Sequence, residues 1–142
     1  ATLLADNAVY AKVAGVLEPV DFYEGLHARL FEKAGELIAS GKEVYEKQCA
    51  SCHQPNGQGL PPAFPALAGS PIVKGPLLGK DGKILKDSHV DRVINGKAGT
   101  AMQAFRNTLS DVELAAVITY ERNSFGNRQG DMIQPAQIKA LR

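Results

Sequence analysis

Two cysteines and a histidine stand close together in the chain, in an arrangement with an evident chemical use. Residues 49–53 read Cys-Ala-Ser-Cys-His, the C-x-x-C-H signature of covalent haem attachment. Two thiols separated by two residues can each add to one vinyl group on the same porphyrin edge. The histidine that follows directly is then held beneath the iron. The motif therefore predicts one haem c, attached through Cys49 and Cys52 and ligated by His53.

Two other uses of the same residues are open from the sequence. A thioredoxin-like redox pair also has C-x-x-C, but it follows a strand in a βαβ unit. Here the motif ends a predicted helix and opens a loop rich in proline and glycine. A structural zinc site needs four ligands, so a distant histidine would have to join Cys49, Cys52 and His53. Haem attachment is favoured over both alternatives.

A haem iron held by His53 has a second axial position, and Met102 is the best candidate for it. Met102 lies in the glycine-loosened stretch 96–102, which can carry a thioether to the far face of the ring. Met132 follows the last long predicted helix in a polar tail, where a surface role is expected. His89 opens a predicted helix, and His27 lies on an N-terminal helix where exposure is expected.

Three predicted helices would position these groups. Each begins with the pattern S-x-x-[DE], in which the hydroxyl and the carboxylate satisfy backbone N–H groups at a helix start. The three pairs are Ser40 with Glu43, Ser88 with Asp91, and Ser110 with Glu113. The predicted helices span about residues 41–49, 89–95 and 111–123, with Gly96 and Gly126 as stops.

The rest of the chain gives weaker signals. Apolar residues recur at helical spacing from about Asp21 to residue 38 and predict an earlier helix. Residues 54–87 hold six of the eight prolines, and Asp81–Gly82 predicts one small hairpin there. A loop of this length is unusual inside a compact domain. It becomes reasonable if it wraps a large apolar cofactor.

Composition and charge exclude some classes of function. The net charge of +1 argues against a nucleic-acid-binding protein, and the apolar run near residues 114–120 is too short for a membrane span of about 20 residues. Residues 1–40 hold six acidic and three basic side chains, whereas the remainder holds nine and thirteen. The lysines at 74, 80, 83 and 86 form either a solvated face or a docking patch for an acidic partner.

The order of these features resembles a class I cytochrome c domain over about residues 37–128. The resemblance implies an all-α fold wrapped around one haem c, preceded by a helical extension at 1–36 and followed by a tail at 129–142. Phe64 to Leu67 resembles the family's proline–leucine element. Pro65 would therefore accept a hydrogen bond from His53 through its backbone carbonyl, and Leu67 would pack on the ring. The helix before the motif would cross the last helix at Tyr45 and Tyr120.

A closer resemblance rests on residues 41–49, 99–105, 114–123 and 125–127. These strings are similar to the fused cytochrome c domain of subunit II of bacterial cytochrome c oxidases, and to cytochromes of periplasmic dehydrogenases and copper nitrite reductases. Gln103 stands where many relatives have proline. Subunit II also has a copper-ligand run, C-x3-C-x3-H-x2-M, and this sequence has none. The sequence could be a fragment of such a protein or a free-standing relative.

The resemblance implies an electron carrier that is not an enzyme by itself. Iron ligated by His53 and Met102 has no open site, so it would pass single electrons between a donor and an acceptor protein. The expected acceptor is a terminal respiratory oxidase in the membrane, or its copper domain; a dehydrogenase or nitrite reductase partner is the alternative. A further alternative is a haem enzyme or gas sensor with a displaceable Met102.

The expected location is the periplasm or the outer face of the bacterial cytoplasmic membrane, because haem c is attached outside the cytoplasm.

Overall fold

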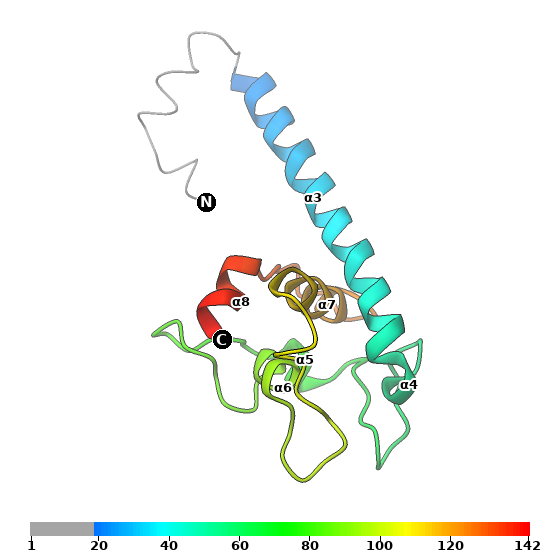
Figure 1. The fold of residues 1–142 in the computed structure, drawn as a ribbon. Coiled ribbons are helices and arrows are strands. Elements are labelled where there is room, and N and C mark those ends of the chain that lie inside the picture. The colour runs from blue at the N-terminus through cyan, green and yellow to red at the C-terminus, as the bar shows by residue number, and fades with distance from the viewer. Residues whose placement is uncertain (1–18) are drawn as a thin grey trace. The chain divides into compact units, whose positions relative to one another are not determined.

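The computed structural model describes residues 19–142 (Figure 1). The chain divides into two compact units, Ala1–Gly35 and Glu36–Arg142. The second unit contains the C-x-x-C-H motif and Met102. Among the residues described, no helix combines the length and the hydrophobicity that crossing a bilayer requires.

Helix α3 (Pro19–Gln48) covers both helices predicted in this part of the chain. The predicted helix start at Ser40 is wrong. The Ser40 hydroxyl donates to the carbonyl oxygen of Leu37 at 3.1 Å, one turn back in the same helix. A serine within a helix commonly makes this bond, and no proline interrupts the sequence between the two predicted segments. The pattern S-x-x-E therefore arose here without a cap.

The other two serine caps are confirmed. Helix α6 (His89–Asn95) begins after Ser88, whose hydroxyl accepts from the backbone N–H of Asp91 at 3.3 Å. Helix α7 (Asp111–Asn123) begins after Ser110, which forms a full capping box with Glu113. Both helices have the predicted bounds. The predicted stop at Gly126 is late, since α7 ends at Asn123 with Ser124 as its C-cap.

The proline-rich segment contains little regular structure. Its helices are short: α4 (Ala50–His53), at the motif itself, and α5 (Pro71–Lys74). The predicted hairpin is present as one antiparallel bridge between Leu78 and Ile84. No strand occurs in residues 19–142, which confirms the all-α prediction for the described part of the chain.

Helix α7 lies at the centre of the core of the second unit. Five consecutive residues, 114–118, are at most 1% exposed, and α5, α6 and α8 pack against the helix. The C-terminal part of α3 approaches α7 at Gly41, where an added Cβ would lie 2.7 Å from the Tyr120 Cβ. The Tyr45 and Tyr120 rings, with centroids 5.6 Å apart, pack beside this contact. Glycine at 41 therefore permits the crossing of these two helices.

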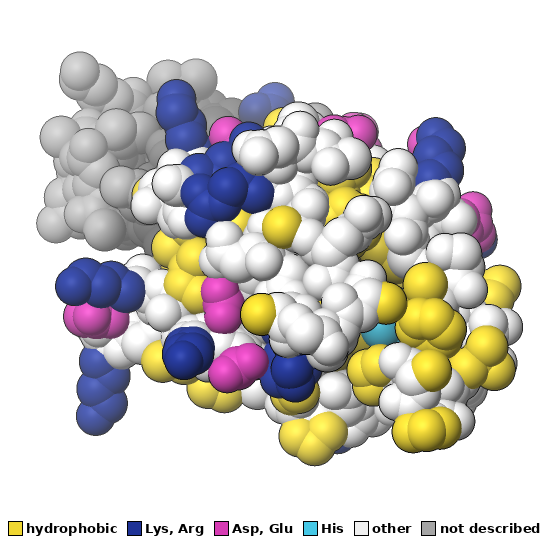
Figure 2. Space-filling model, turned by 60° about the horizontal axis from the view of Figure 1, so that its bottom comes forward, with side chains coloured by type: hydrophobic (Ala, Val, Ile, Leu, Met, Phe, Trp, Pro, Cys, Tyr) yellow, Lys and Arg dark blue, Asp and Glu magenta, His cyan; other side chains and the backbone are white. Residues whose placement is uncertain are grey.

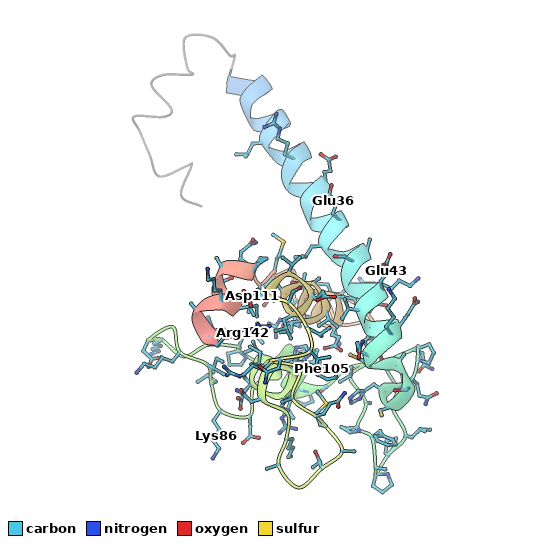
Figure 3. All side chains as sticks on the ribbon, viewed as in Figure 1. Glu36, Glu43, Lys86, Phe105, Asp111 and Arg142 are labelled. Carbon is cyan, nitrogen blue, oxygen red and sulfur yellow. The ribbon has the colours of Figure 1, made fainter. Side chains whose placement is uncertain are left out.

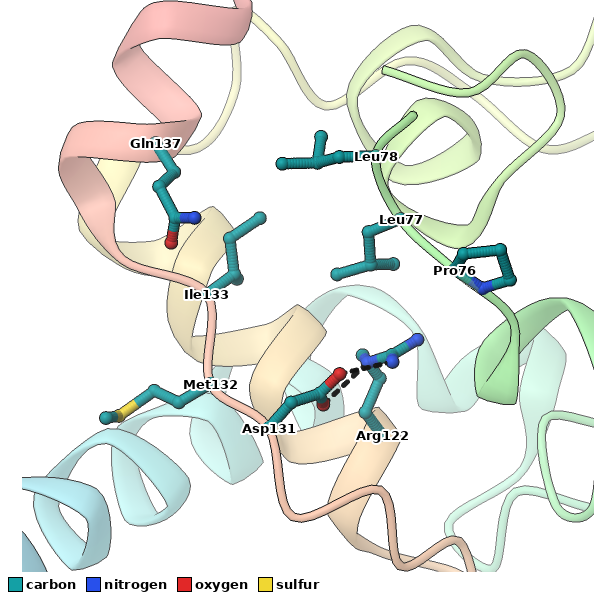
Figure 4. Close-up of a pocket in the computed structure, with 8 residues that line it drawn as sticks. All are labelled: Pro76, Leu77, Leu78, Arg122, Asp131, Met132, Ile133 and Gln137. Carbon is teal, nitrogen blue, oxygen red and sulfur yellow. Dashed lines mark hydrogen bonds and ion pairs between the residues drawn. The ribbon is translucent and has the colours of Figure 1, made fainter. Parts of the chain in front are cut away.

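The segment after residue 128 is more ordered than the sequence indicates. It forms helix α8 (Pro135–Leu141), and Ile133 and Ile138 are buried in the core. The carboxylate of Asp131 pairs with the buried guanidinium of Arg122 beside a cavity of about 250 Å³ (Figure 4). At the chain's end, Arg142 Nε lies 3.0 Å from the Asp111 carboxylate at the start of α7 (Figure 3).

Candidate functional site

The C-x-x-C-H motif lies where α3 gives way to α4. The backbone N–H groups of Cys52 and His53 both donate to the carbonyl oxygen of Cys49, at 3.1 and 2.9 Å. This tight turn brings both cysteines and the histidine to one side of a single cavity. The preceding helix is fixed by Tyr45, which is fully buried and donates its hydroxyl to the carbonyl oxygen of Gln54 at 2.6 Å.

The His53 ring is held in a defined orientation. Its Nδ1 lies 2.8 Å from the backbone carbonyl oxygen of Pro65, the contact that the resemblance implies. A carbonyl oxygen only accepts, so the ring proton is on Nδ1. The lone pair of Nε2 is therefore free to bind a metal ion, and the carbonyl increases the basicity of the ring.

The cavity is about 400 Å³ in volume, within the range of ligand-binding sites. Its apolar lining comprises Pro62, Ala63, Phe64, Pro65, Ala66, Leu67, Ile72, Val73, Val93, Ala101, Met102 and Phe105. Figure 2 shows a histidine side chain (cyan) among hydrophobic side chains on the face that it displays. This cavity fits haem c. It combines two thiols, an imidazole whose Nε2 lone pair is free, a thioether and apolar walls.

Met102 is supported by backbone contacts of the loop between α6 and α7. Its carbonyl oxygen accepts from Lys97 N–H at 3.0 Å, and its own N–H donates to the Thr100 hydroxyl at 3.2 Å. The loop folds back closely on Gly96, where an added Cβ would lie 2.7 Å from the Met102 carbonyl oxygen. The local fold therefore depends on a glycine, as the sequence indicated.

The other candidate axial ligands are less suitable. Met132 is 36% exposed and lines the smaller cavity beside Arg122. The side chain of His27 lies outside the described residues. His89 does line the large cavity, but its Nε2 lies 2.6 Å from a carboxylate oxygen of Glu121. His89 is the first residue of α6, as predicted, and it is 4% exposed.

Glu121 is a cavity residue that the sequence analysis missed. It is 3% exposed and lies on α7, on the wall near Cys49. Burial raises the pKa of the Cys49 thiol, and the Glu121 carboxylate raises it further by its charge and a hydrogen bond. The helical spacing contained the signal, because Glu121 follows Leu114, Val117 and Ile118 by seven, four and three residues.

Asn127 is a second residue whose role was missed. It is 1% exposed, and its amide nitrogen donates to the carbonyl oxygens of Leu67 and Glu121 at 3.0 and 2.9 Å. Its amide oxygen accepts from Gly69 N–H at 2.9 Å. These bonds tie the loop that carries Leu67 to the end of α7, so Asn127 fixes one wall of the cavity.

The two rival uses of the motif find no support in the structure. Within residues 19–142 no group of three or more His, Cys, Asp or Glu side chains is arranged to hold a metal ion, as a zinc site requires. The strand expected before a thioredoxin-like pair is also absent there, because α3 precedes the motif.

Two family models match parts of this chain, to different extents. The family model described as "Cytochrome C oxidase, cbb3-type, subunit III" matches residues 36–120, more than half of the chain. A model described as "DnaB-like helicase N terminal domain" matches residues 1–46, less than half. Only the first match is long enough to show a family, and it contains the C-x-x-C-H motif and Met102.

Several curated relatives are cytochromes. An alcohol dehydrogenase (quinone) cytochrome c subunit of Gluconobacter oxydans is 32% identical over 84% of this chain and 25% of its own length. Cytochrome c-552 of Thermus thermophilus is 33% identical over 63% of this chain and 70% of its own length. A cbb3-type cytochrome c oxidase subunit CcoP of Azospirillum is 34% identical over 64% and 30%.

The chain spans about a quarter of the length of the dehydrogenase subunits that it matches. The helical structure and the family match together confirm the predicted class I cytochrome c fold. They also agree with the predicted cofactor. The chain therefore belongs to the cytochrome c family whose model is described as "Cytochrome C oxidase, cbb3-type, subunit III", and it binds haem c covalently.

Proposed function

We propose that the chain transfers single electrons through one haem c, which Cys49 and Cys52 attach and His53 and Met102 ligate. The supporting observation is that these four side chains line one largely apolar cavity. When bound, haem c supplies an iron that cycles between the ferric and ferrous states. Methionine ligation and burial both favour the ferrous state and raise the potential.

The side chains of the cavity have separate roles in this proposal. His53 is oriented by the Pro65 carbonyl oxygen, so its Nε2 would hold the iron in a fixed orientation. Met102 would hold the iron as its second ligand and would leave no site there for a substrate. Leu67 and the other apolar side chains exclude water from the ring. The chain is therefore a carrier and not an enzyme by itself.

Replacing Met102 by alanine tests the proposed ligand. We expect Met102→Ala to lower the potential by a sizeable fraction of the ~0.8 V range that axial ligands span. It should also open the iron to carbon monoxide, while the haem stays on the denatured chain. Met132→Ala is the matched control, because Met132 lines the other cavity. An unchanged spectrum and potential in Met102→Ala would refute the assignment of Met102.

For the partner, we propose delivery of electrons to a terminal respiratory oxidase in the membrane or to its copper domain, as in oxidase subunit II. The family match and the CcoP relative support an oxidase. The dehydrogenase relatives support the alternative, a cytochrome subunit serving a dehydrogenase. The full-length gene product separates the two: an upstream copper-ligand run with two membrane spans supports subunit II, and a fused or neighbouring dehydrogenase supports the alternative.

The proposed location is the periplasm or the outer face of the bacterial cytoplasmic membrane, where haem c is attached. Within the chain, we propose residues 37–128 as the cytochrome domain, with 1–36 as an extension and 129–142 as a terminal segment.

The lysines at 74, 80, 83 and 86 are all exposed, which supports a docking patch for an acidic partner. Reversing their charge should slow electron transfer to that partner at low salt, and slow it less at high salt.

A further inference from the structure

A buried acid–base pair lines the cavity that we assign to the haem. His89 is the first residue of α6, Glu121 lies near the end of α7, and their side chains are 5% and 4% exposed. His89 Nε2 and a Glu121 carboxylate oxygen are 2.6 Å apart. Neither side chain belongs to the motif or to the proposed ligand pair. Buried ionisable groups are costly, so their position on this wall requires an explanation.

The unpaired nitrogen of His89 indicates where the protons are. Its Nδ1 is buried and has no hydrogen-bond partner within the described residues. An imidazolium would place a charged, unpaired N–H there, and a protonated Glu121 that donates to Nε2 would also force a proton onto Nδ1. A neutral imidazole that donates from Nε2 to the Glu121 carboxylate leaves no N–H group unpaired. The pair then carries one negative charge.

This negative charge lies close to Cys49, one of the two cysteines proposed to attach the haem. The Glu121 carboxylate interacts with the sulfur of Cys49, the N-cap of α4, and with the phenol of Tyr45 on α3. The other charged side chains on the cavity wall are Arg92 and Lys97. The guanidinium of Arg92 bonds to the backbone and carboxylate of Asp87 and is partly exposed, and Lys97 is exposed. Neither cation contacts Glu121 in the described hydrogen bonds and ion pairs.

We propose that Glu121 is a potential-setting residue: its buried carboxylate, held by His89, is a counter-charge that stabilises the ferric haem. Ferric haem carries one more positive charge than ferrous haem, so a negative charge on the cavity wall favours the oxidised form. The effect is strong because a cavity of low dielectric constant screens charges poorly. Once the Cys49 sulfur is a thioether it has no proton to donate, which leaves His89 as the donor to Glu121.

The test is a redox titration at pH 8 of the full chain, matured with its haem, in wild type and Glu121→Gln. An ordinary carboxyl group is ionised at this pH and an imidazole is neutral. We expect Glu121→Gln to shift the ferrous-to-ferric ratio at fixed applied potential about tenfold toward ferrous, a rise of about 59 mV for one electron. A shift below threefold, or one toward ferric, would overturn the proposal.

A second variant separates charge from packing. His89→Leu removes the donor that holds the Glu121 carboxylate on this wall, so the potential should rise as in Glu121→Gln. The double variant should rise no further than Glu121→Gln alone. If His89→Leu and Glu121→Gln raise the potential additively, the pair does not act as one unit and the proposal fails. Glu43→Gln removes the same charge from an exposed site on α3 and should leave the potential unchanged.

This inference rests on the proposed function, and the spectra distinguish the two failures. If the wild-type protein lacks covalent haem or the methionine–iron charge-transfer band, the proposed function fails. If all variants keep both features and Glu121→Gln does not shift the potential, only the role of Glu121 fails.

Discussion

The two sides of the haem cavity are built in different ways. On the His53 side, Cys49 caps the short helix α4, Cys52 and His53 lie in that helix, and the His53 ring is fixed by the Pro65 carbonyl oxygen. On the Met102 side, a loop of eight residues between Gly96 and Phe105 carries the ligand candidate. Lys97 and Thr100 of this loop form hydrogen bonds with the backbone of Met102, not with its side chain. The first side is therefore fixed by a short helix and a hydrogen bond to the histidine ring, and the second by the fold of a loop.

This difference indicates how each side should respond to substitution. The His53 side depends on how closely α3 approaches α7, so changes there should alter the stability of the whole domain. The Met102 side depends on the conformation of one loop, so changes there should alter ligation before they unfold the protein.

The largest loss of stability is expected from Gly41→Ala. The new Cβ would overlap the Ala116 carbonyl group and approach the Tyr120 Cβ to 2.7 Å, which forces the two helices apart. We expect a loss of about 3 kcal/mol, the upper end of the overpacking range. Denaturant unfolding of the matured protein measures it. Gly35→Ala, in the same helix with no atom within 4 Å, should instead gain up to about 1 kcal/mol. Equal behaviour of the two variants would refute the close approach.

The Met102 side is tested by Gly96→Ala. Gly96 has φ 71° and ψ −168°, a backbone conformation essentially restricted to glycine, and its Cβ would also press on the Met102 carbonyl oxygen. We expect a loss of about 2 kcal/mol together with a weaker methionine–iron band and faster carbon monoxide binding. Gly99→Ala is the control, because φ is 75° there but the surrounding space is open. It should lose stability without changing ligation.

Tyr45→Phe tests the His53 side by removing one hydrogen bond. The Gln54 carbonyl oxygen loses its donor, so we expect a loss of about 1 kcal/mol with the charge-transfer band unchanged. Burial raises the pKa of the Tyr45 phenol, so above about pH 10 the unfolded state ionises first and wild-type stability falls. Tyr45→Phe should lose less stability than wild type over that pH range. A weakened methionine band in this variant would mean that the two sides are coupled.

The smallest effect is expected from Ser110→Ala, which touches neither side. Loss of the cap of α7 should cost about 1 kcal/mol and leave the potential unchanged. Hydrogen bonds from Ser110 lower the pKa of Glu113, so this contribution is present above the ordinary carboxyl pKa and is lost as pH falls through the lowered value. Unfolding at pH 7 and pH 3 should therefore show a smaller difference between wild type and variant at pH 3.

The sequence predicted those features that depend on residues close together in the chain, and it missed those that join distant segments. The motif, the caps at Ser88 and Ser110 and the helices after them depend on residues close in the chain, so local rules recovered them. The continuity of α3 through Ser40 could not be read locally, because the same S-x-x-E pattern fits a cap and a helix interior. The burial of His89 against Glu121, and the bonds of Asn127 to the loop at Leu67, join segments distant in sequence. The pairing of Glu121 with His89 could not be predicted from local spacing, because the two residues are 32 positions apart and meet only in the fold.

The central claim, a haem c closed on both faces by His53 and Met102, is tested most directly by optical spectra of the full chain, oxidised and then reduced under carbon monoxide. We predict a methionine–iron charge-transfer band at the red end of the ferric spectrum, and no carbon monoxide binding by the ferrous protein. A high-spin ferric spectrum with rapid carbon monoxide binding would contradict the account.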